Sequence, residues 1–570
     1  MEVGKDMLDI AQKQRSLVLK AERKSDQRIG CLFPLVCQRE WMIQAMWNVL
    51  HNQGAETAGV DGIVKATYYD VETKSLTSKA IRRSEEICQS LMEGSYHPHP
   101  VRRIYIPKAN GKTRPIGIST LDDRTVQEAI RMVLEPIYES DFLNCSYGFR
   151  PNRCTMDAVS VCIRLIQPIT KYYWVIEGDI RGYFNSVDHK ILMKLLRQRI
   201  ADRRLTDTIY RFLKAGYQED GLVHKPSVGT PQGSVASPLL ANLYLHELDK
   251  WWSENYDHNK SARRRKHLGN FILVRYCDDF IILSNGTRQA TEAMKAEVTM
   301  FLKDELRLEL SQEKTAITHA TEGFDFLGFH IRKFGKHGGV MITPTKANVQ
   351  KIRDRISRTL SRKNHEVAVV DVIRALNPVI RGWSNYYRYV NSARTFHALD
   401  FYLGAKFMKW YRGKYRMPAR KGSVEAHKWM DRRKPFHLSR FSDVKVKRYR
   451  WRRHSNPYIE MDVKQLTSIP FPETNWYGKS DRNADLRILC FQRDQGVCQI
   501  CMRPKTNLVA HDIIPISKGG ENVLGNLITL CEDCHREYHK ELHYECRSWQ
   551  EIRRLVGSRV RGNRACTVST

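Results

Sequence analysis

With 570 residues and a mass of 66.5 kDa, the chain is longer than one hydrophobic core can organise, and it is expected to form roughly three to five domains. Its 42% hydrophobic and 27% charged residues exclude a wholly disordered chain, and its net charge of +32 indicates a polyanionic partner, with nucleic acid as the first candidate. An anionic membrane is the competing candidate, but Met1–Asp6 is acidic and polar where a signal peptide is basic and then apolar, and no apolar run approaches a membrane span. We therefore predict a cytoplasmic protein with no membrane partner.

The predicted elements mix helices with a few antiparallel strands. Apolar residues at three- and four-residue spacing predict helices over 1–45, 80–93, 122–140, 186–216, 288–305 and 345–415. Apolar or alternating runs predict strands over 101–106 and 172–180, and a hairpin over 271–284. This pattern is typical of an α+β multidomain protein.

The most informative segment is Tyr276-Cys277-Asp278-Asp279, which lies between the two apolar strands of the predicted hairpin. Adjacent carboxylates at a hairpin tip repel each other unless a cation lies there, although turns also favour solvated aspartates. A third carboxylate, Asp179, ends the strand at 172–180. If both strands belong to one sheet, Asp179, Asp278 and Asp279 converge and suit a pair of Mg²⁺ ions about 4 Å apart. We therefore predict phosphoryl transfer, in which a 3′-hydroxyl attacks the α-phosphate of a nucleotide.

Positive charge is concentrated in residues 341–480, which hold 31 Lys and Arg against 10 Asp and Glu, a net charge of +21. Such an uneven distribution of charge predicts a region that binds phosphates with a strong dependence on salt concentration. Residues 445–458 interleave arginines with Tyr449 and Trp451, a pairing typical of nucleic-acid binding, with a solvated charge run as the alternative. Three aromatic residues share one face of the preceding helical stretch and are interpreted as core packing: Trp383, Tyr386 and Tyr387.

Cysteines are also distributed unevenly, since seven of the 14 lie in the last 81 residues. The first seven show no paired spacing and are expected to be buried apolar thiols. Two C-x-x-C pairs have the spacing of a tetrahedral Zn²⁺ site, which a reducing compartment favours over disulfides. The predicted zinc ligands are Cys498, Cys501, Cys531 and Cys534.

Seven motifs within residues 54–330 resemble those of group II intron reverse transcriptases and maturases, in the family's order. They are RRIYIPKANGKTRPIGISTLDDRTVQEAI, SYGFRPNRCTMDAV, VIEGDIRGYFNSVDH, GTPQGSVASPLLANLYLHELD, RYCDDFIIL, LELSQEKTAI and FDFLGF. The resemblance continues over nearly the whole chain. It implies a right-hand polymerase with fingers, a palm built on an antiparallel sheet, and a helical thumb. The implied activities are RNA-directed DNA synthesis and splicing of the RNA of a mobile group II intron.

The resemblance implies a role for each matching residue near the acidic turn. Asp179 and Asp278 are the main Mg²⁺ ligands, and Asp279 completes the acidic cluster. Ile180 provides a backbone carbonyl. Phe184 occupies the position of the aromatic residue that collides with a ribose 2′-hydroxyl, so that deoxynucleotides are favoured by exclusion.

Further residues are implied to contact the nucleotide. Lys108 and Arg114 lie where cations meet the triphosphate, and fixed positive charge there neutralises charge that develops on the phosphates. Gln232 lies near the nascent base pair, and Gly233 lets the backbone approach it. Lys314 matches a lysine that protonates the leaving pyrophosphate.

The basic middle of the chain resembles the family's thumb or maturase domain, followed by a DNA-binding linker. The implied contacts to nucleic acid are Arg381, Arg388, Lys406, Lys409, Arg412, Lys447, Arg448, Arg450, Arg452 and Arg453. The implied partners are the intron RNA, as a ribonucleoprotein with the lariat, together with target DNA, an RNA template with its primer, and dNTPs. The oligomeric state stays open between monomer and dimer.

The C-terminal segments VAHDIIPISKGGENVLGNLITL and CHREYH resemble an HNH endonuclease, a small ββα-metal module stabilised here by zinc. The resemblance implies a divalent ion held by His511, Asn526 and His535, and a base that activates water. The sequence departs from the family at His511-Asp512, because Asp512 occupies the position of the general-base histidine. An ordinary aspartate pKa near 4 matches neutral pH poorly for a general base. Asp512 is nevertheless the candidate base at this position, and we expect the zinc-stabilised fold to be kept.

Five domains are expected, in chain order: an N-terminal extension with the start of the fingers (1–100), fingers and palm (101–340), thumb or maturase domain (341–415), basic DNA-binding linker (416–480) and HNH-like module (481–570). Two alternatives remain for the whole chain. One is an RNA-binding splicing factor with an inactive nuclease domain or inactive chemistry. The other is a reverse transcriptase of this type recruited to another role, such as phage defence.

Overall fold

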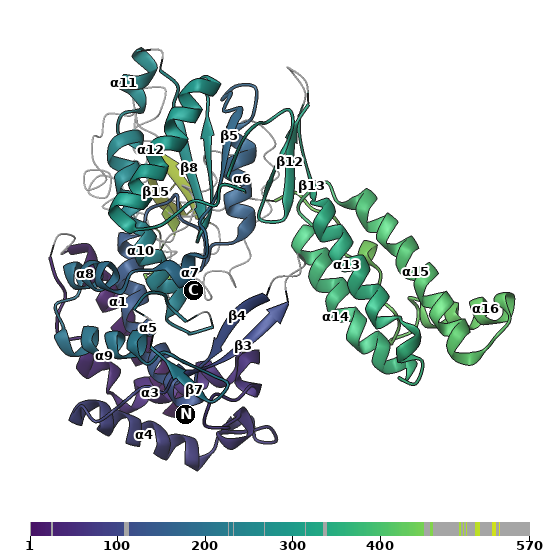
Figure 1. Cartoon of the computed structure of the whole chain (residues 1–570), viewed down its shortest axis with the longest axis horizontal. Coiled ribbons are helices and arrows are strands. Elements are labelled where there is room, and N and C mark those ends of the chain that lie inside the picture. Colours follow the sequence, from purple (N-terminus) through teal and green to yellow (C-terminus); the bar gives the residue numbers. More distant parts are fainter. Residues whose placement is uncertain are drawn as a thin grey trace, which may run out of the picture. The chain divides into compact units, whose positions relative to one another are not determined.

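The structure is a computed structural model. It describes residues 2–23, 27–107, 113–225, 227–231, 233–266, 268–313, 315–334, 339–449 and 456–459, and nearer the C-terminus residues 490–491, 494, 498, 508–512, 527–531 and 535. The chain divides into two compact units, Met1–Trp451 and Arg452–Thr570, each described by itself below. Both units contain strands and the first contains many helices, so the predicted α+β class is confirmed (Figure 1).

The first unit is built on a four-stranded antiparallel sheet in the order β10-β5-β9-β8. Its strands are β5 (Trp174–Asp179), β8 (Phe271–Tyr276), β9 (Asp279–Ser284) and β10 (Ala316–His319). The predicted strand at 172–180 and the hairpin at 271–284 are therefore confirmed. Their apolar residues alternate between two cores, because successive side chains of a strand point to opposite faces.

One face of this sheet packs on three long helices, and the other packs on a fourth helix and on elements further along the chain. The first core includes Ile176 and Ile282 with apolar residues of α5 (Leu121–Asp141), α10 (Ser237–Trp252) and α12 (Arg288–Leu306). The second core includes Val175 and Ile281 with residues of α6 (Thr155–Leu165). Burial on both faces explains why the sequence of these strands is almost continuously apolar.

A second sheet has the order β4-β3-β6-β7. Its strands are β3 (Val101–Pro107), β4 (Thr113–Ile118), β6 (Tyr217–Glu219) and β7 (Leu222–His224). β3 pairs antiparallel with β4 and parallel with β6, so the predicted strand at 101–106 is confirmed.

Most of the predicted helices are present. The N-terminal region contains α1 (Glu2–Arg23), α2 (Phe33–Val36), α3 (Arg39–Leu50) and α4 (Ser78–Glu93). The N-terminal region also contains the short elements η1 (Gln53–Glu56), η2 (Lys65–Thr67), β1 (Tyr69–Asp70) and β2 (Ser75–Leu76). Two further short helices, η3 (Ser253–Asp257) and α11 (Lys260–Arg265), lie between α10 and β8. No helix in the described part of the chain is long and apolar enough to cross a membrane.

The prediction of one helix over 186–216 is wrong. The segment forms α7 (Tyr183–Ser186), α8 (His189–Arg199) and α9 (Arg203–Lys214). The side chain of Asp188 accepts hydrogen bonds from the amides of Lys190 and Ile191, and that of Asp202 accepts one from Leu205. Both aspartates therefore act as N-caps that begin new helices.

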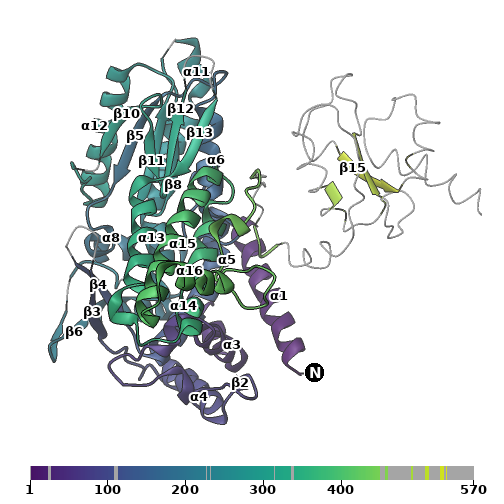
Figure 2. The same ribbon diagram turned by 90° about the vertical axis from the view of Figure 1, so that its right-hand side faces the viewer.

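The predicted helical stretch at 345–415 is confirmed as three helices that lie side by side (Figure 2). A small sheet precedes them, and a fourth helix follows. The elements are β11 (Phe324–Phe326), β12 (Phe329–Lys333), β13 (Val340–Pro344), α13 (Lys346–Thr359), η4 (Arg362–Asn364), α14 (Val369–Tyr387), α15 (Ala393–Tyr415), α16 (Ala419–Trp429) and η5 (Phe441–Asp443).

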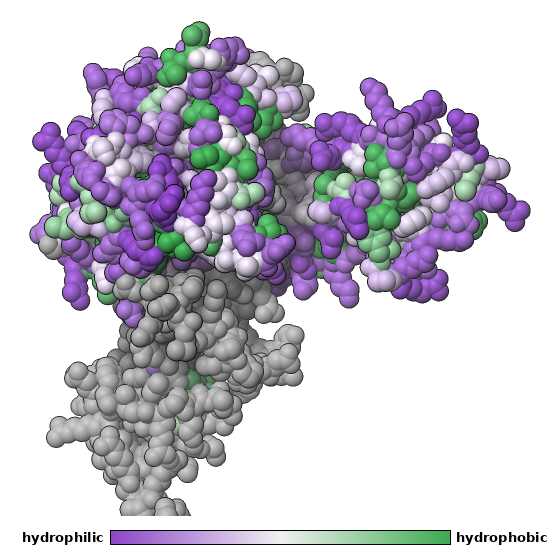
Figure 3. Space-filling view, turned by 90° about the horizontal axis from the view of Figure 1, so that it is seen from below, coloured by the Kyte–Doolittle hydropathy of each residue, from purple (hydrophilic) through white to green (hydrophobic). Residues whose placement is uncertain are grey.

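The aromatic face of α14 packs inward, as interpreted from the sequence. Tyr387 is buried, and Trp383 contacts the rings of Phe396 and Phe441. Tyr386 is 38% exposed, but its ring stacks on that of Phe329 at 5.1 Å. The outer surface of these helices is mostly hydrophilic, with one smaller apolar patch in the view of Figure 3.

The cysteines of the first unit are only partly as expected. Cys37, Cys88, Cys162 and Cys277 are buried, whereas Cys31 and Cys154 are exposed. Cys154 lies at the N-cap position of α6, before its first residue.

The described part of the second unit contains one antiparallel pair of strands, β14 (Leu508–Asp512) and β15 (Leu527–Cys531). β15 is buried throughout. The amide of Thr529 donates to Asp494, and its hydroxyl donates to the carbonyl of Cys490, so these bonds fix the strand pair to the segment before it.

Candidate active site

The acidic residues lie at one end of the central sheet. Asp179 ends β5 and Asp279 begins β9, and the two are direct partners in the antiparallel register. Residues directly opposite on such a pair have Cβ atoms about 5 Å apart on the same face. Asp278 is the second residue of the two-residue turn that joins β8 to β9. Carboxylates that are about 100 positions apart in the sequence are thus brought together.

The electrostatic environment of Asp278 reflects this proximity. Burial raises the pKa of its carboxyl, and the nearby charge of Asp179 raises it further. Hydrogen bonds from its own amide and from Cys277, and the positive charge of Arg114, act in the opposite direction. Within the described ranges, no three His, Cys, Asp or Glu side chains are gathered as closely as a formed metal site requires.

The turn itself is held by a buried ion pair that the sequence analysis missed. Arg275, with 0% exposure, donates to Asp249 of α10 through Nε at 2.8 Å and through Nη2. It also donates to the carbonyl of Cys277 at 3.1 Å and to Ser146 Oγ at 2.8 Å. Burial alone would raise the pKa of Asp249, but the Arg275 guanidinium lowers it to about 2. The sequence feature that could have indicated this ion pair is an arginine within an otherwise apolar strand.

The backbone of the turn is tightly packed and unusual. Cys277 is buried and has φ = 59°, in the left-handed region that side chains other than glycine rarely adopt. A Cβ at Gly148 would lie 2.5 Å from the amide nitrogen of Cys277, so the SYGFR motif approaches the turn as only glycine permits. Strained conformations held by their surroundings cluster at functional sites.

Residues implied to contact a nucleotide lie on elements around the acidic end. Bonds from Arg181 N to Glu309 O and from Ser311 N to Asp179 O flank Ile180. In an antiparallel pair of this kind the carbonyl of Ile180 points away from the partner segment. Phe184, in α7, is partly buried against the first core, and its carbonyl accepts from Thr230 N.

The loop that carries Gly233 lies against the second sheet. A Cβ at Gly233, whose φ is 106°, would lie 2.5 Å from the carbonyl oxygen of Gly117 in β4. Arg114, the second residue of the same strand, is exposed. Three further residues of the predicted site lie outside the described residues: Lys108, Gln232 and Lys314.

The predicted nucleic-acid contacts are spread along α14, α15 and the segment after α16. Arg381, Lys409, Lys447 and Arg448 are exposed, whereas Arg388, Lys406 and Arg412 are half-buried. Lys406, for example, lies over the ring of Tyr402 at 5.6 Å. Three members of this set lie outside the described residues: Arg450, Arg452 and Arg453.

In the second unit, two of the predicted nuclease residues lie together. Nδ1 of His511 in β14 is 3.1 Å from Nε2 of His535, a separation that suits two ligands of one divalent ion. Asp512 is the last residue of β14, and its side chain is outside the description. Cys498 and Cys531 are buried. Asn526, Cys501 and Cys534 lie outside the described residues.

Three family models match successive parts of the chain. Residues 106–331 match reverse transcriptase (RNA-dependent DNA polymerase), residues 349–429 match the group II intron, maturase-specific domain, and residues 498–541 match HNH endonuclease. These matches define the class of protein, an RNA-directed DNA polymerase joined to maturase and HNH domains. Reverse transcriptase and HNH domains generally use divalent metal ions.

Relatives of known sequence place the chain within that class. It is 39% identical over 358 residues to Protein YkfC of Escherichia coli (strain K12), covering 59% of this chain and 92% of that protein. It is 37% identical over 338 residues to the group II intron-encoded protein LtrA of Lactococcus lactis subsp. cremoris, covering 50% of this chain and 54% of LtrA. The chain belongs to the group II intron-encoded proteins, as a reverse transcriptase and maturase with an HNH endonuclease domain.

Proposed function

We propose that the acidic end of the central sheet is the site of DNA synthesis on an RNA template. Asp179, Asp278 and Asp279, with the backbone carbonyl of Ile180, would hold two Mg²⁺ ions. These oxygen donors are the type that Mg²⁺ prefers. When bound, such ions supply positive charge that stabilises the attacking 3′-oxygen and the leaving pyrophosphate. The observation that carries the proposal is the register pairing of Asp179 with Asp279 beside Asp278.

The surrounding residues would select and orient the nucleotide. Arg114, whose charge acts on Asp278, would bind the triphosphate together with Lys108. Phe184 would exclude a ribose 2′-hydroxyl. Gln232 and Gly233 would contact the nascent base pair, and Lys314 would protonate the leaving pyrophosphate.

On the same basis, we assign residues 101–340 to the fingers and palm, with the second sheet in the fingers and the central sheet in the palm, and the helices α13 to α15 to the thumb (341–415). The basic segment 416–480 would bind DNA. The whole protein would act in a ribonucleoprotein with the intron lariat, using target DNA, an RNA template, a primer and dNTPs. The maturase-specific match and the excess positive charge of this region support RNA as a partner.

A second activity, DNA nicking, is proposed for the C-terminal unit. The 3.1 Å approach of His511 and His535 favours it. Zn²⁺ on Cys498, Cys501, Cys531 and Cys534 would hold the module, and a divalent ion on His511, Asn526 and His535 would lie at the scissile phosphate. Asp512 would be the general base that takes a proton from water.

Primer extension on an RNA template tests the proposal. We expect the wild type to extend the primer with dNTPs and Asp278→Asn to lose about a thousandfold in rate, since a lost metal ligand removes several kcal/mol of transition-state stabilisation. Asp304→Asn makes the same change at an exposed aspartate of α12 and should retain the wild-type rate. Extension by Asp278→Asn at the wild-type rate, or no extension by the wild type, would refute the assignment.

A further inference from the structure

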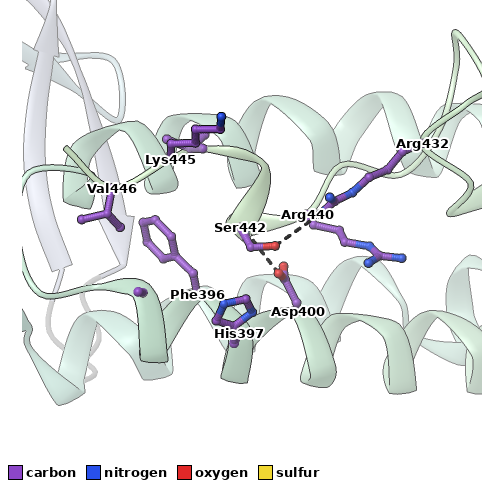
Figure 4. Close-up of a pocket in the computed structure, with 10 residues that line it drawn as sticks. Phe396, His397, Asp400, Arg432, Arg440, Ser442, Lys445 and Val446 are labelled. Atoms are coloured by element: carbon purple, nitrogen blue, oxygen red, sulfur yellow. Dashed lines mark hydrogen bonds between the residues drawn. The ribbon is translucent and has the colours of Figure 1, made fainter.

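A pocket of about 700 Å³ lies between the N-terminal half of α15 and the segment that follows α16 (Figure 4). It lies on a different part of the unit from the acidic end of the central sheet, and part of its lining, from Arg432 to Val446, belongs to the basic segment 416–480. Phe396, His397 and Asp400 come from α15, whereas Arg440, Lys445 and Val446 come from the returning segment. The size falls in the range of sites that take a nucleotide or a small organic ligand.

The wall of the pocket is built by specific contacts. The carboxylate of Asp400 accepts hydrogen bonds from the amides of Phe441 at 2.6 Å and Ser442 at 3.2 Å. Phe441 is fully buried and packs on Trp383. Arg432 is 2.6 Å from Asp443 and donates to the hydroxyl of Ser442 at 3.3 Å. These contacts hold the returning segment in one position on α15, so the site is largely preformed.

The pocket has two chemically different ends. Phe396 and Val446 lie together at one end in Figure 4, and the guanidinium groups of Arg432 and Arg440 lie at the other. Asp400 and Ser442 lie between the two ends, and Lys445 and His397 lie on opposite sides. An apolar end, a central acceptor and a cationic end match the base, sugar and phosphate of one nucleotide.

We propose that this pocket binds one unpaired nucleotide of an RNA strand. The base would lie against Val446, which is 42% exposed beside the buried ring of Phe396, and the two phosphates that flank the nucleotide would lie near Arg440 and Lys445, both of which are exposed. Unpaired bases in RNA are commonly bound in this way, by apolar surface with cations beside the backbone. This inference rests on the proposed function, which makes RNA a partner. It assigns residues 432–446 of the basic segment to RNA and leaves DNA binding to the rest of that segment.

Asp400 favours RNA over DNA as the occupant. A carboxylate only accepts hydrogen bonds and repels phosphate, so in this pocket it suits a hydroxyl donor. Its two oxygens have acceptor capacity beyond the two amides they already bind. A ribose offers a 2′-hydroxyl, and a deoxyribose does not.

The test measures equilibrium binding of the full chain to a fluorescent, unstructured oligoribonucleotide of about ten nucleotides and to its DNA counterpart. The wild type should prefer RNA by about two- to tenfold, the value of one hydrogen bond. Arg440→Gln/Lys445→Gln should weaken RNA binding about tenfold and reduce the salt slope by about 1.4, since two single-strand phosphate contacts are lost.

Two further variants distinguish RNA binding in the pocket from nonspecific attraction of RNA by positive charge. Arg433→Gln/Lys434→Gln removes the same charge from exposed positions of the same segment outside the lining, and RNA binding should weaken by less than about threefold. Ala393→Trp fills the exposed rim of the pocket without changing charge, and it should abolish the preference for RNA. Thermal unfolding of each variant checks that it is folded.

The outcomes are distinct from those of the polymerase test. Equal losses in the two double variants, an unchanged RNA preference in Ala393→Trp, or equal binding of RNA and DNA by the wild type would overturn the pocket proposal. A wild type that fails in primer extension would overturn the polymerase assignment, and the binding measurements would still decide the pocket.

Discussion

The buried pair Arg275–Asp249 offers the sharpest test of how the fold supports the acidic turn. Arg275→Met keeps a long apolar side chain but removes every hydrogen bond to Asp249, Ser146 and the Cys277 carbonyl. Asp249 has 0% exposure, so its carboxylate would stay buried without its cation. Breaking one side of a buried pair destabilises a protein by about 3–5 kcal/mol.

The effect should depend on pH in a defined direction. In the wild type the pKa of Asp249 is lowered to about 2, so the pair stabilises the fold above the ordinary aspartate pKa near 4, and this contribution is lost as the pH falls towards 2. Without Arg275, burial would raise the pKa of Asp249, and protonation would stabilise the variant as the pH falls. The difference between the two proteins should therefore shrink from pH 7 to pH 4.

Urea unfolding of the full chain, followed by tryptophan fluorescence, measures the difference. Arg288→Met is the matched control, because its ion pair with Glu292 is 66% and 53% exposed, and it should change stability by about 0.5 kcal/mol or less. Arg275→Met/Asp249→Leu should recover much of the lost stability but leave primer extension slow, since the bond to Cys277 stays absent. If Arg275→Met unfolds at the same urea concentration as Arg288→Met, the reasoning is refuted.

Three further predictions concern other sites. Phe184→Ala should raise incorporation of UTP relative to dTTP by at least about tenfold in primer extension if, as proposed, its ring excludes the 2′-hydroxyl; an unchanged ratio would assign selectivity to another residue. Tyr449→Phe removes the hydroxyl that bonds to Asp157 at 2.5 Å and lies 3.3 Å from the sulfur of the exposed Cys154. Partial desolvation raises the pKa of the Cys154 thiol, but that hydroxyl lowers it, so alkylation of Cys154, read by mass spectrometry, should slow in this variant, whereas Tyr415→Phe should leave it unchanged; equal rates in both would contradict this contact. Asp512→Ala should lose nicking of target DNA while retaining bound zinc, and undiminished nicking would mean that another group is the base.

The sequence was sufficient to predict the strands that carry the acidic residues. The runs around Asp179 and Asp278 are apolar on both faces because each face of the sheet is buried, and such runs differ clearly from the flanking loops. The family motifs then indicated at which ends of these strands the functional residues lie. The register that pairs Asp179 with Asp279 depends on tertiary structure and had to come from the coordinates.

Contacts between distant residues were beyond prediction from local patterns. The break between α8 and α9 depends on Asp202, which also accepts from the amides of Leu32 and Phe33 about 170 residues earlier; within the helical pattern it resembles any surface aspartate. Arg275 was read only as part of a motif, since its partner Asp249 lies on another element. The pattern around Tyr449 predicts nucleic-acid binding, but it could not show that the Tyr449 hydroxyl donates to Asp157, 292 positions earlier.

The proposed polymerase site requires that three carboxylates at the end of one sheet share divalent ions. Binding of Mn²⁺, a paramagnetic substitute for Mg²⁺, can be counted by electron paramagnetic resonance in the full chain with primer, template and dNTP. We predict that Asp179→Asn and Asp278→Asn each weaken this binding by at least about tenfold, as expected for a lost ligand, and that Asp304→Asn has no effect. Unchanged Mn²⁺ binding in both Asp179→Asn and Asp278→Asn would show that these carboxylates do not hold the ions.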